Sequence, residues 1–138
     1  MDLKTMRRPL FPCYRNTDDL NGATEGRNER EANQHYAIWV KDNPAADKEN
    51  GNVSYNQIKK RGGTYITLVE RMLFEMKYFL ETGEHMDTQE TYTMCAGSRD
   101  SDGYVPYVCW HRGSGEMYVY WYYADDSDSR VRARAVVS

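Results

Sequence analysis

The chain has 138 residues, a formal net charge of −3 and twelve tyrosines, which supply most of its 13% aromatic content. A chain of this length is long enough for one domain with its own hydrophobic core, and this many aromatic residues exclude a wholly disordered protein. The acidic balance argues against a general nucleic-acid binder or a membrane-surface protein, because both classes are usually basic.

The sequence also lacks the apolar segments that targeting and membrane insertion require. No apolar run approaches the roughly 20 residues of a membrane-spanning helix, and residues 1–8 contain no apolar stretch typical of a secretory leader. The protein is therefore expected to be soluble and cytoplasmic. Its three cysteines, Cys13, Cys95 and Cys109, are too few and too scattered for a disulfide framework and are predicted to be reduced thiols.

Residues 1–31 show neither of the apolar periods that mark a strand or a helix, and their apolar patch is confined to the region of Leu10 and Phe11. This segment is predicted to be an N-terminal arm that is partly disordered or docked. Residues 32–138 are predicted to form a single α+β domain.

Two or three helices are predicted next. An apolar stripe over residues 30–42 indicates the first, and a shorter pattern over 53–60 indicates the second. The strongest helical pattern covers residues 64–82, with Thr64 as the N-cap and Gly83 just past the C-terminus. Its apolar stripe comprises Ile66, Val69, Leu73, Met76 and Leu80, and its opposite side carries Glu70, Arg71, Glu75, Lys77 and Glu81. A stripe this wide predicts that the helix lies across a sheet.

The rest of the chain reads as strands separated by three turns rich in Gly, Asp and Ser. The predicted strands are 89–98, 104–112, 116–124 and 130–137. They predict an antiparallel meander with an irregularity at Pro106, because proline cannot donate a ladder hydrogen bond. The predicted fold class is therefore α+β, with two or three N-terminal helices packed on one face of a four-stranded antiparallel β-meander. The core is expected to draw on Trp39, Ile66, Val69, Leu73, Met76, Leu80, Val119, Trp121, Val131 and Ala133.

The last two predicted strands carry the strongest candidate site. Because side chains alternate between the faces of a strand, every second residue shares a side. The rows formed in this way are Tyr118, Tyr120 and Tyr122 on one strand, and Arg130, Arg132 and Arg134 on the next. A symmetric turn would place the two rows beside each other, opposite the buried face. Guanidinium groups stack on aromatic rings and bind anions, so these six side chains are the predicted binding site.

Three interpretations of this Tyr/Arg face stay open. It can be plain surface cover, since cross-strand pairs stabilise a sheet and protect its terminal strand. It can bind a partner protein or a second copy, because interfaces are enriched in tyrosine and arginine, and a homodimer is then expected. It can also stack the bases of a single-stranded nucleic acid, a role that the acidic total charge disfavours.

Cysteine and histidine positions offer a weaker candidate. Cys109 and His111 share a strand face, and a hairpin would bring Cys95 near them, a set that would suit zinc. The closely spaced cysteine pair of most zinc sites is missing, and free cysteine commonly behaves as a small buried hydrophobe. Neither a metal nor a cofactor is therefore predicted.

Two further groups carry little weight. Residues 59–63 form a basic, glycine-ended run before Thr64, where a helix N-terminus would favour an anion. The run does not match the spacing of a phosphate-binding loop, so a solvated hinge is the preferred interpretation. His85 beside Glu84 and Asp87 suggests an acid–base pair, although the dipole at a helix C-terminus also favours a histidine there.

The predicted function is that of a small non-enzymatic binding protein that uses the Tyr/Arg face for a protein partner or for self-association. Single-stranded nucleic-acid binding on the same face is one alternative. A hydrolase-like enzyme using His85 and His111 near a helix–sheet cleft is another. It is disfavoured because the sequence contains no nucleophile elbow, zinc-protease helix or dinucleotide fingerprint.

Overall fold

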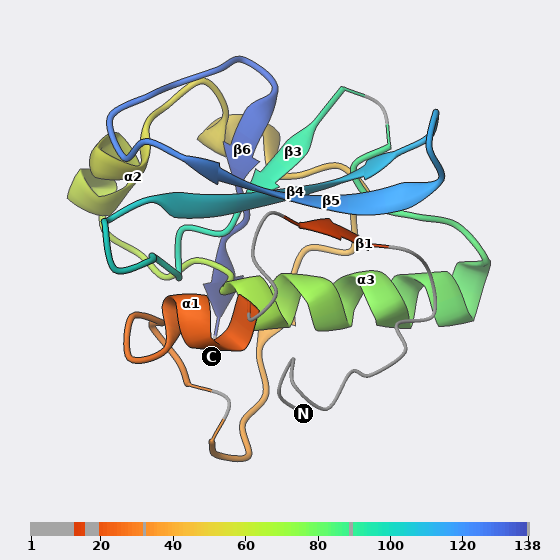
Figure 1. Ribbon diagram of the computed structural model, residues 1–138, viewed down its shortest axis with the longest axis horizontal. Helices are drawn as coiled ribbons and strands as arrows, with labels where there is room; N and C mark the ends of the chain where they lie inside the picture. The colour runs from red at the N-terminus through yellow and green to blue at the C-terminus, as the bar shows by residue number, and fades with distance from the viewer. Residues whose placement is uncertain (1–12, 16–19, 32, 89, 138) are drawn as a thin grey trace.

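A mixed five-stranded sheet forms the middle layer of the computed structural model, which describes residues 13–15, 20–31, 33–88 and 90–137 (Figure 1). Its strands in spatial order are β1 (Cys13–Arg15), β5 (Glu116–Tyr122), β4 (Val105–His111), β3 (Tyr92–Met94) and β6 (Val131–Ala133). On one side lie α1 (Leu20–Thr24) and α3 (Leu68–Thr82), and toward the other lies α2 (Tyr55–Arg61). The remaining elements are β2 (Trp39–Val40), β7 (Val136–Val137) and the 3-10 turn η1 (Lys48–Asn50). None of the described helices has the length and apolar character needed to cross a membrane.

The mixed α+β class is confirmed, whereas the four-stranded antiparallel meander is wrong. β3, β4 and β5 are antiparallel neighbours, but β6 pairs in parallel with the outer edge of β3. β1 already occupies the outer edge of β5, so β6 cannot pair there. Beside β3, Val131 and Ala133 join Met94 and Val105 in a buried apolar cluster, which stabilises this topology.

α3 begins later than predicted because a better cap follows Thr64. Thr67 is the N-cap, and it forms a capping box with Glu70, whose carboxylate accepts the Thr67 N–H at 2.9 Å. The box satisfies two backbone donors that would otherwise be unpaired. Thr64 instead belongs to an extended segment, where its carbonyl accepts the Val136 N–H at 3.0 Å. Gly83 ends the helix in the left-handed conformation with a φ of 75°, as predicted.

Over the described part of residues 30–42 no helix forms, contrary to the prediction. Arg30 and Tyr36 are instead held at the first turn of α3, where both donate to Glu70, at 2.7 and 2.9 Å. Trp39 lies in the two-stranded sheet of β2 and β7 and is 77% exposed, so it is not a core residue. It lines a groove of about 590 Å³ against α3.

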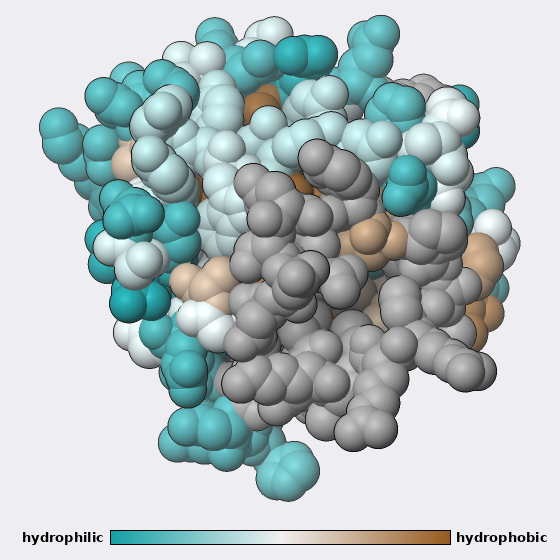
Figure 2. Space-filling model, in the orientation of Figure 1, coloured by the Kyte–Doolittle hydropathy of each residue, from teal (hydrophilic) through white to brown (hydrophobic). Residues whose placement is uncertain are grey.

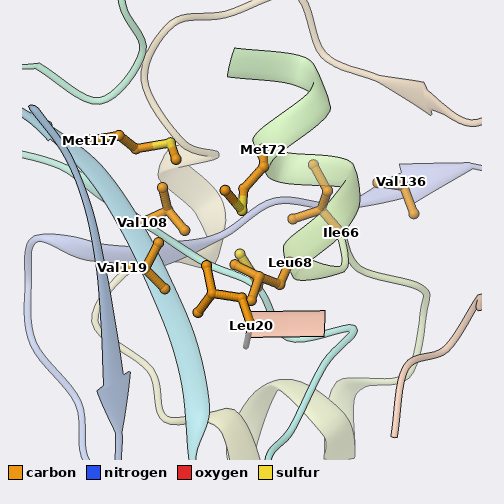
Figure 3. Close-up of a cluster of buried hydrophobic side chains, with 9 residues drawn as sticks. Leu20, Ile66, Leu68, Met72, Val108, Met117, Val119 and Val136 are labelled. Carbon is orange, nitrogen blue, oxygen red and sulfur yellow. The ribbon is translucent and has the colours of Figure 1, made fainter. Parts of the chain in front are cut away.

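Two apolar clusters pack on the two sides of the five-stranded sheet. In the first, Leu68 and Met72 of α3 face Val108 and Val119 of the sheet (Figure 3). Leu20 of α1 joins it, so the segment before residue 32 contributes to the same core. The second cluster lies under α2 and consists of Tyr55, Ile58, Tyr65, Met94, Ala96, Val105, Val131 and Ala133.

The buried side of α3 differs from the predicted stripe. Leu80 is 69% exposed, although it was expected in the core. Arg71 and Glu75, which the sequence placed opposite the stripe, are completely buried. The helix is therefore rotated so that charged side chains face the sheet, where they find the partners described below.

Candidate functional site

Five tyrosines on one side of the sheet form an aromatic surface that we call the Tyr face: Tyr92, Tyr107, Tyr118, Tyr120 and Tyr122. β3, β4 and β5 supply them, and the strand register places all five on the side away from α3. The three tyrosines of β5 thus share one side of their strand. All five are half-buried, and their rings contact one another.

Tyr107 is the centre of these ring contacts. Its ring stacks on that of Tyr120 with 5.1 Å between centroids. It meets Tyr92 and Tyr122 edge-on at 5.6 and 5.3 Å, and Tyr118 meets Tyr120 edge-on at 5.4 Å. Offset and edge-on arrangements are the favourable ones for aromatic pairs, so the rings hold one another in place. A ligand that binds here immobilises few additional side chains, which lowers the entropic cost of binding.

Three hydroxyl groups of the Tyr face, those of Tyr107, Tyr120 and Tyr122, stay protonated at neutral pH. Burial raises the pKa of Tyr120 to about 12 and raises the pKa values of Tyr107 and Tyr122 above their ordinary range. Each neutral phenol can donate and accept hydrogen bonds. The sheet lies in the upper part of Figure 2, where hydrophilic colours predominate. The Tyr face is therefore amphipathic, since it combines apolar rings with hydrogen-bonding hydroxyl groups.

Residues 123–130, which we call the acidic crossover, border the Tyr face. β5 and β6 run in the same direction with β4 and β3 between them, so their connection has to travel back along the strands. Figure 1 shows it passing over the side of the sheet opposite to α3. It carries three acids, Asp125, Asp126 and Asp128, against one cation, Arg130. The border of the Tyr face thus has an excess of two negative charges.

The predicted Arg row does not lie beside the tyrosines of β5, because β4 and β3 separate β6 from β5. Arg132 is in register with Thr93, whose hydroxyl points to the α3 side of the sheet. There Arg132 Nη1 donates to the Ala46 carbonyl at 3.3 Å. Arg134 is completely buried on the same side. The expected lattice of alternating tyrosines and arginines is therefore wrong.

Arg130 alone among the three predicted arginines meets the Tyr face. Its guanidinium carbon lies 5.4 Å from the centre of the Tyr92 ring, a cation–π distance. The same guanidinium binds Asp128 at 3.1 Å and holds the pKa of that carboxyl below its ordinary value. The Tyr face therefore already binds one guanidinium group of the protein itself, between the Tyr92 ring and the Asp128 carboxylate of the acidic crossover.

Sequence reasoning missed a buried ionic cluster between α3 and the sheet. Arg71 binds Glu75 at 2.7 Å and Asp87 at 2.9 Å, and Arg134 contacts Asp87 at 3.4 Å. All four side chains are fully buried, and their two positive and two negative charges balance. The spacing of Arg71 and Glu75 by four residues was the available signal, but such pairs usually lie on a solvated helix face.

The two histidines of the enzyme alternative lie on opposite sides of the sheet. His85 Nδ1 is 2.9 Å from the Glu75 carboxylate, and its ring stacks on Trp110 with 3.3 Å between centroids. His111, the next residue of β4, points the other way and stacks on Tyr118 at 4.8 Å. These two histidines therefore do not form one site.

The cysteine–histidine group is also divided by the sheet. Cys95 belongs to the apolar cluster under α3, whereas Cys109 is in register with Tyr118 on the Tyr side. In the part of the chain that the structure describes, no three His, Cys, Asp or Glu side chains gather in a way that could hold a metal ion. Cys95 and Cys109 are buried free thiols.

Cys95 and Cys109 should be almost unreactive toward Ellman's reagent in the folded protein. Burial raises the pKa of each thiol to about 12. At about pH 8 only one thiol in roughly ten thousand is then ionised, and the thiolate is the reactive form. A Cys13→Ser variant should release no thionitrobenzoate until guanidinium unfolds it. Rapid release from the folded variant would contradict the assigned burial.

The basic run at residues 59–63 does not lead into a helix N-terminus. Lys59, Lys60 and Arg61 form the last turn of α2, where cations complement the helix dipole. Gly62 follows with a φ of 75°, a conformation that glycine adopts readily. The anion site considered at Thr64 therefore has no helix to support it.

The Tyr face thus combines a preorganised set of phenol rings with carboxylates at its border, an arrangement chemically suited to cations and hydrogen-bonding groups. Comparisons with protein-family models, curated proteins and solved structures find no match to this chain.

Proposed function

We propose that this protein is a non-enzymatic binding protein whose Tyr face and acidic crossover bind a basic segment of a partner protein. The observation that carries the proposal is the placement of Arg130, which lies over Tyr92 while paired with Asp128. A partner's arginine or lysine would repeat this arrangement over the neighbouring rings, with Asp125 and Asp126 as counter-charges.

The chemistry of the face favours a cation for two reasons. The faces of tyrosine rings carry negative electrostatic potential, so they attract guanidinium and ammonium groups. The acidic crossover adds an attraction of the same sign, since Asp125 and Asp126 are exposed and neither is engaged in an ion pair within the described residues. A bound cation would therefore neutralise part of the negative charge of the acidic crossover, whereas a bound anion would add to it.

The same arrangement weakens the two alternatives for this face. A nucleic acid would need free cations for its phosphates, but Arg132 and Arg134 are turned away and Arg130 is paired. An isologous homodimer centred on Tyr107 and Tyr120 would bring two acidic crossovers into one interface, where their like charges repel.

The test is calorimetric titration with hexa-arginine, hexalysine and hexaglutamate peptides. We expect the two cationic peptides to bind, with an affinity that falls as salt rises, and hexaglutamate to give no heat. Tyr120→Ala should weaken binding of hexa-arginine by about fivefold or more, whereas Tyr120→Phe keeps the ring and should retain most of it. Asp126→Asn should weaken binding as well.

Matched controls separate this site from the rest of the surface. Tyr78→Ala removes a half-buried tyrosine and Asp42→Asn an exposed acid, and both residues line the groove against α3 on the other side of the sheet. Both should bind as the unchanged protein does. Equal loss in these controls, or binding of oligothymidylate in place of hexa-arginine, would refute the proposal. A dimer in sedimentation that Tyr120→Ala dissociates, without peptide binding, would favour self-association instead.

A further inference from the structure

A second pocket, whose lining includes no residue of the Tyr face, has a buried floor and a cationic rim. It has a volume of about 460 Å³ and lies between residues 26–29, the turn at 96–99 and α2. Ala96 and Ser98, each 1% exposed, belong to its floor. A pocket of this volume is within the range of small-molecule sites.

The rim carries more positive charge than the protein itself neutralises. Its charged members are Arg27, Lys59 and Arg99 against a single carboxylate, Glu29, an excess of two positive charges in a chain of net charge −3. Glu29 is already engaged, because Lys59 Nζ binds it at 2.5 Å and the Tyr65 N–H donates to it at 3.0 Å.

The two arginines of the rim lack carboxylate partners among the described residues. Arg27 Nη1 donates to the Glu25 carbonyl at 3.2 Å, a neutral acceptor. The guanidinium of Arg99 lies over the ring of Tyr55, 5.9 Å from its centre. Both side chains are exposed at the mouth of the pocket, so they can reorient onto a ligand.

Tyr55 draws two of these cations together. Lys59 Nζ lies 5.7 Å and Arg99 Cζ 5.9 Å from the centre of the same ring. The two cations repel each other, and an anion bound between them would attract both and so offset this repulsion. The arrangement therefore favours a negatively charged ligand.

We propose that this pocket binds a small organic ligand through a phosphate group, with Arg99, Arg27 and Lys59 as its contacts. A phosphate monoester carries close to two negative charges at neutral pH, which matches the excess on the rim. Two of its oxygens can accept hydrogen bonds from two parallel N–H groups of one guanidinium. The ammonium group of a lysine cannot form such a bidentate pair. The remaining volume admits the organic part of the ligand. The site shares no residue with the Tyr face, so it stands or falls independently of the proposed function.

The test is calorimetric titration with glycerol 3-phosphate, inorganic phosphate and succinate. We expect glycerol 3-phosphate to bind most tightly, inorganic phosphate more weakly and succinate least. Arg99→Gln and Lys59→Gln should each weaken binding of glycerol 3-phosphate by about tenfold. Lys60→Gln is the matched control, because Lys60 is the next residue of α2 and does not line the pocket.

Three results would overturn the proposal. Equal affinity for succinate would refute phosphate as the recognised group. Unchanged affinity in both Arg99→Gln and Arg27→Gln would place the binding elsewhere, as would an amide NMR spectrum in which Gly97 and Ser98 do not shift. The absence of saturable heat from glycerol 3-phosphate up to about 10 mM would refute the site itself, because even a weak specific site is half-saturated near 1 mM.

Discussion

Replacing Asp87 by asparagine should lower the free energy of unfolding by about 3 to 5 kcal/mol, the usual cost of removing one partner from a buried ion pair. Guanidinium denaturation at neutral pH measures this change. Asparagine keeps the size of the side chain and tolerates the left-handed backbone of Asp87, whose φ is 51°. The loss should therefore report the charge and not the shape.

The expected size follows from how much of the buried cluster depends on this carboxylate. It accepts hydrogen bonds from Arg71 at 2.9 Å and from the hydroxyls of Thr91 and Thr93 at 2.9 and 2.5 Å. Burial already holds the pKa of Arg134 below its ordinary value, with Asp87 as the main opposing influence. Without Asp87 two buried guanidinium groups would share the single charge of Glu75.

Two further variants define the result. Asp102→Asn, an exposed change, should alter stability by no more than about 0.5 kcal/mol. The double variant Asp87→Asn with Arg134→Met restores charge balance, so its loss should fall short of the sum of the single losses by about 1 kcal/mol or more. A loss below about 1 kcal/mol for Asp87→Asn alone would show that the cluster does not stabilise the fold.

Gly97→Ala should be the second most damaging single change, with a loss of about 3 kcal/mol in the free energy of unfolding, at the upper end of typical overpacking costs. A Cβ at Gly97 would lie 2.4 Å from the Tyr65 carbonyl oxygen and 2.9 Å from that of Ile66. Both neighbours are backbone atoms, so no side-chain rotation can make room. The Gly97 N–H also donates to the Ile66 carbonyl at 2.9 Å, and separating the chains would break that bond.

Gly113→Ala is the matched control for this prediction. A Cβ there would lie 3.0 Å from the ring of His111, an exposed side chain that needs to shift by only a few tenths of an ångström. We expect its effect on thermal and denaturant unfolding to stay within about 0.5 kcal/mol. Equal losses in the two variants would mean that the close approach of residues 65–66 to Gly97 does not restrain the fold.

Elements stabilised by near neighbours in the chain were predictable. α2, the end of α3 at Gly83 and the antiparallel order of β3, β4 and β5 follow from capping residues, turns and periodicity. The start of α3 was missed by three residues, because Thr64 and Thr67 both qualify as N-caps. Only the Thr67 hydroxyl has a glutamate three residues later to complete a capping box.

Elements stabilised by distant partners were not predictable in the same way. Residues 30–42 have a helical stripe, yet Arg30 and Tyr36 are held by Glu70, far along the chain. Only the tyrosine part of the candidate site was predicted correctly, because the alternation of side chains along a strand places the tyrosines of β5 on one face. The position of the arginines depended on where β6 pairs, which alternation does not determine. No local feature of residues 130–137 distinguishes the edge of β5 from the edge of β3.

The C-terminal strands illustrate the division most clearly. Alternation in the sequence was sufficient to place Tyr118, Tyr120 and Tyr122 on one side of β5 and to bury Val131 and Ala133, since side-chain direction in a strand is a local property. Which surfaces then meet was settled by tertiary packing. Pairing of β6 with β3 sent Arg134 into a buried ionic cluster and drew an acidic crossover beside the tyrosines. The physical reason is that burial and charge balance are summed over segments distant in sequence. The tyrosines predicted to lie beside a row of arginines therefore lie beside an acidic segment.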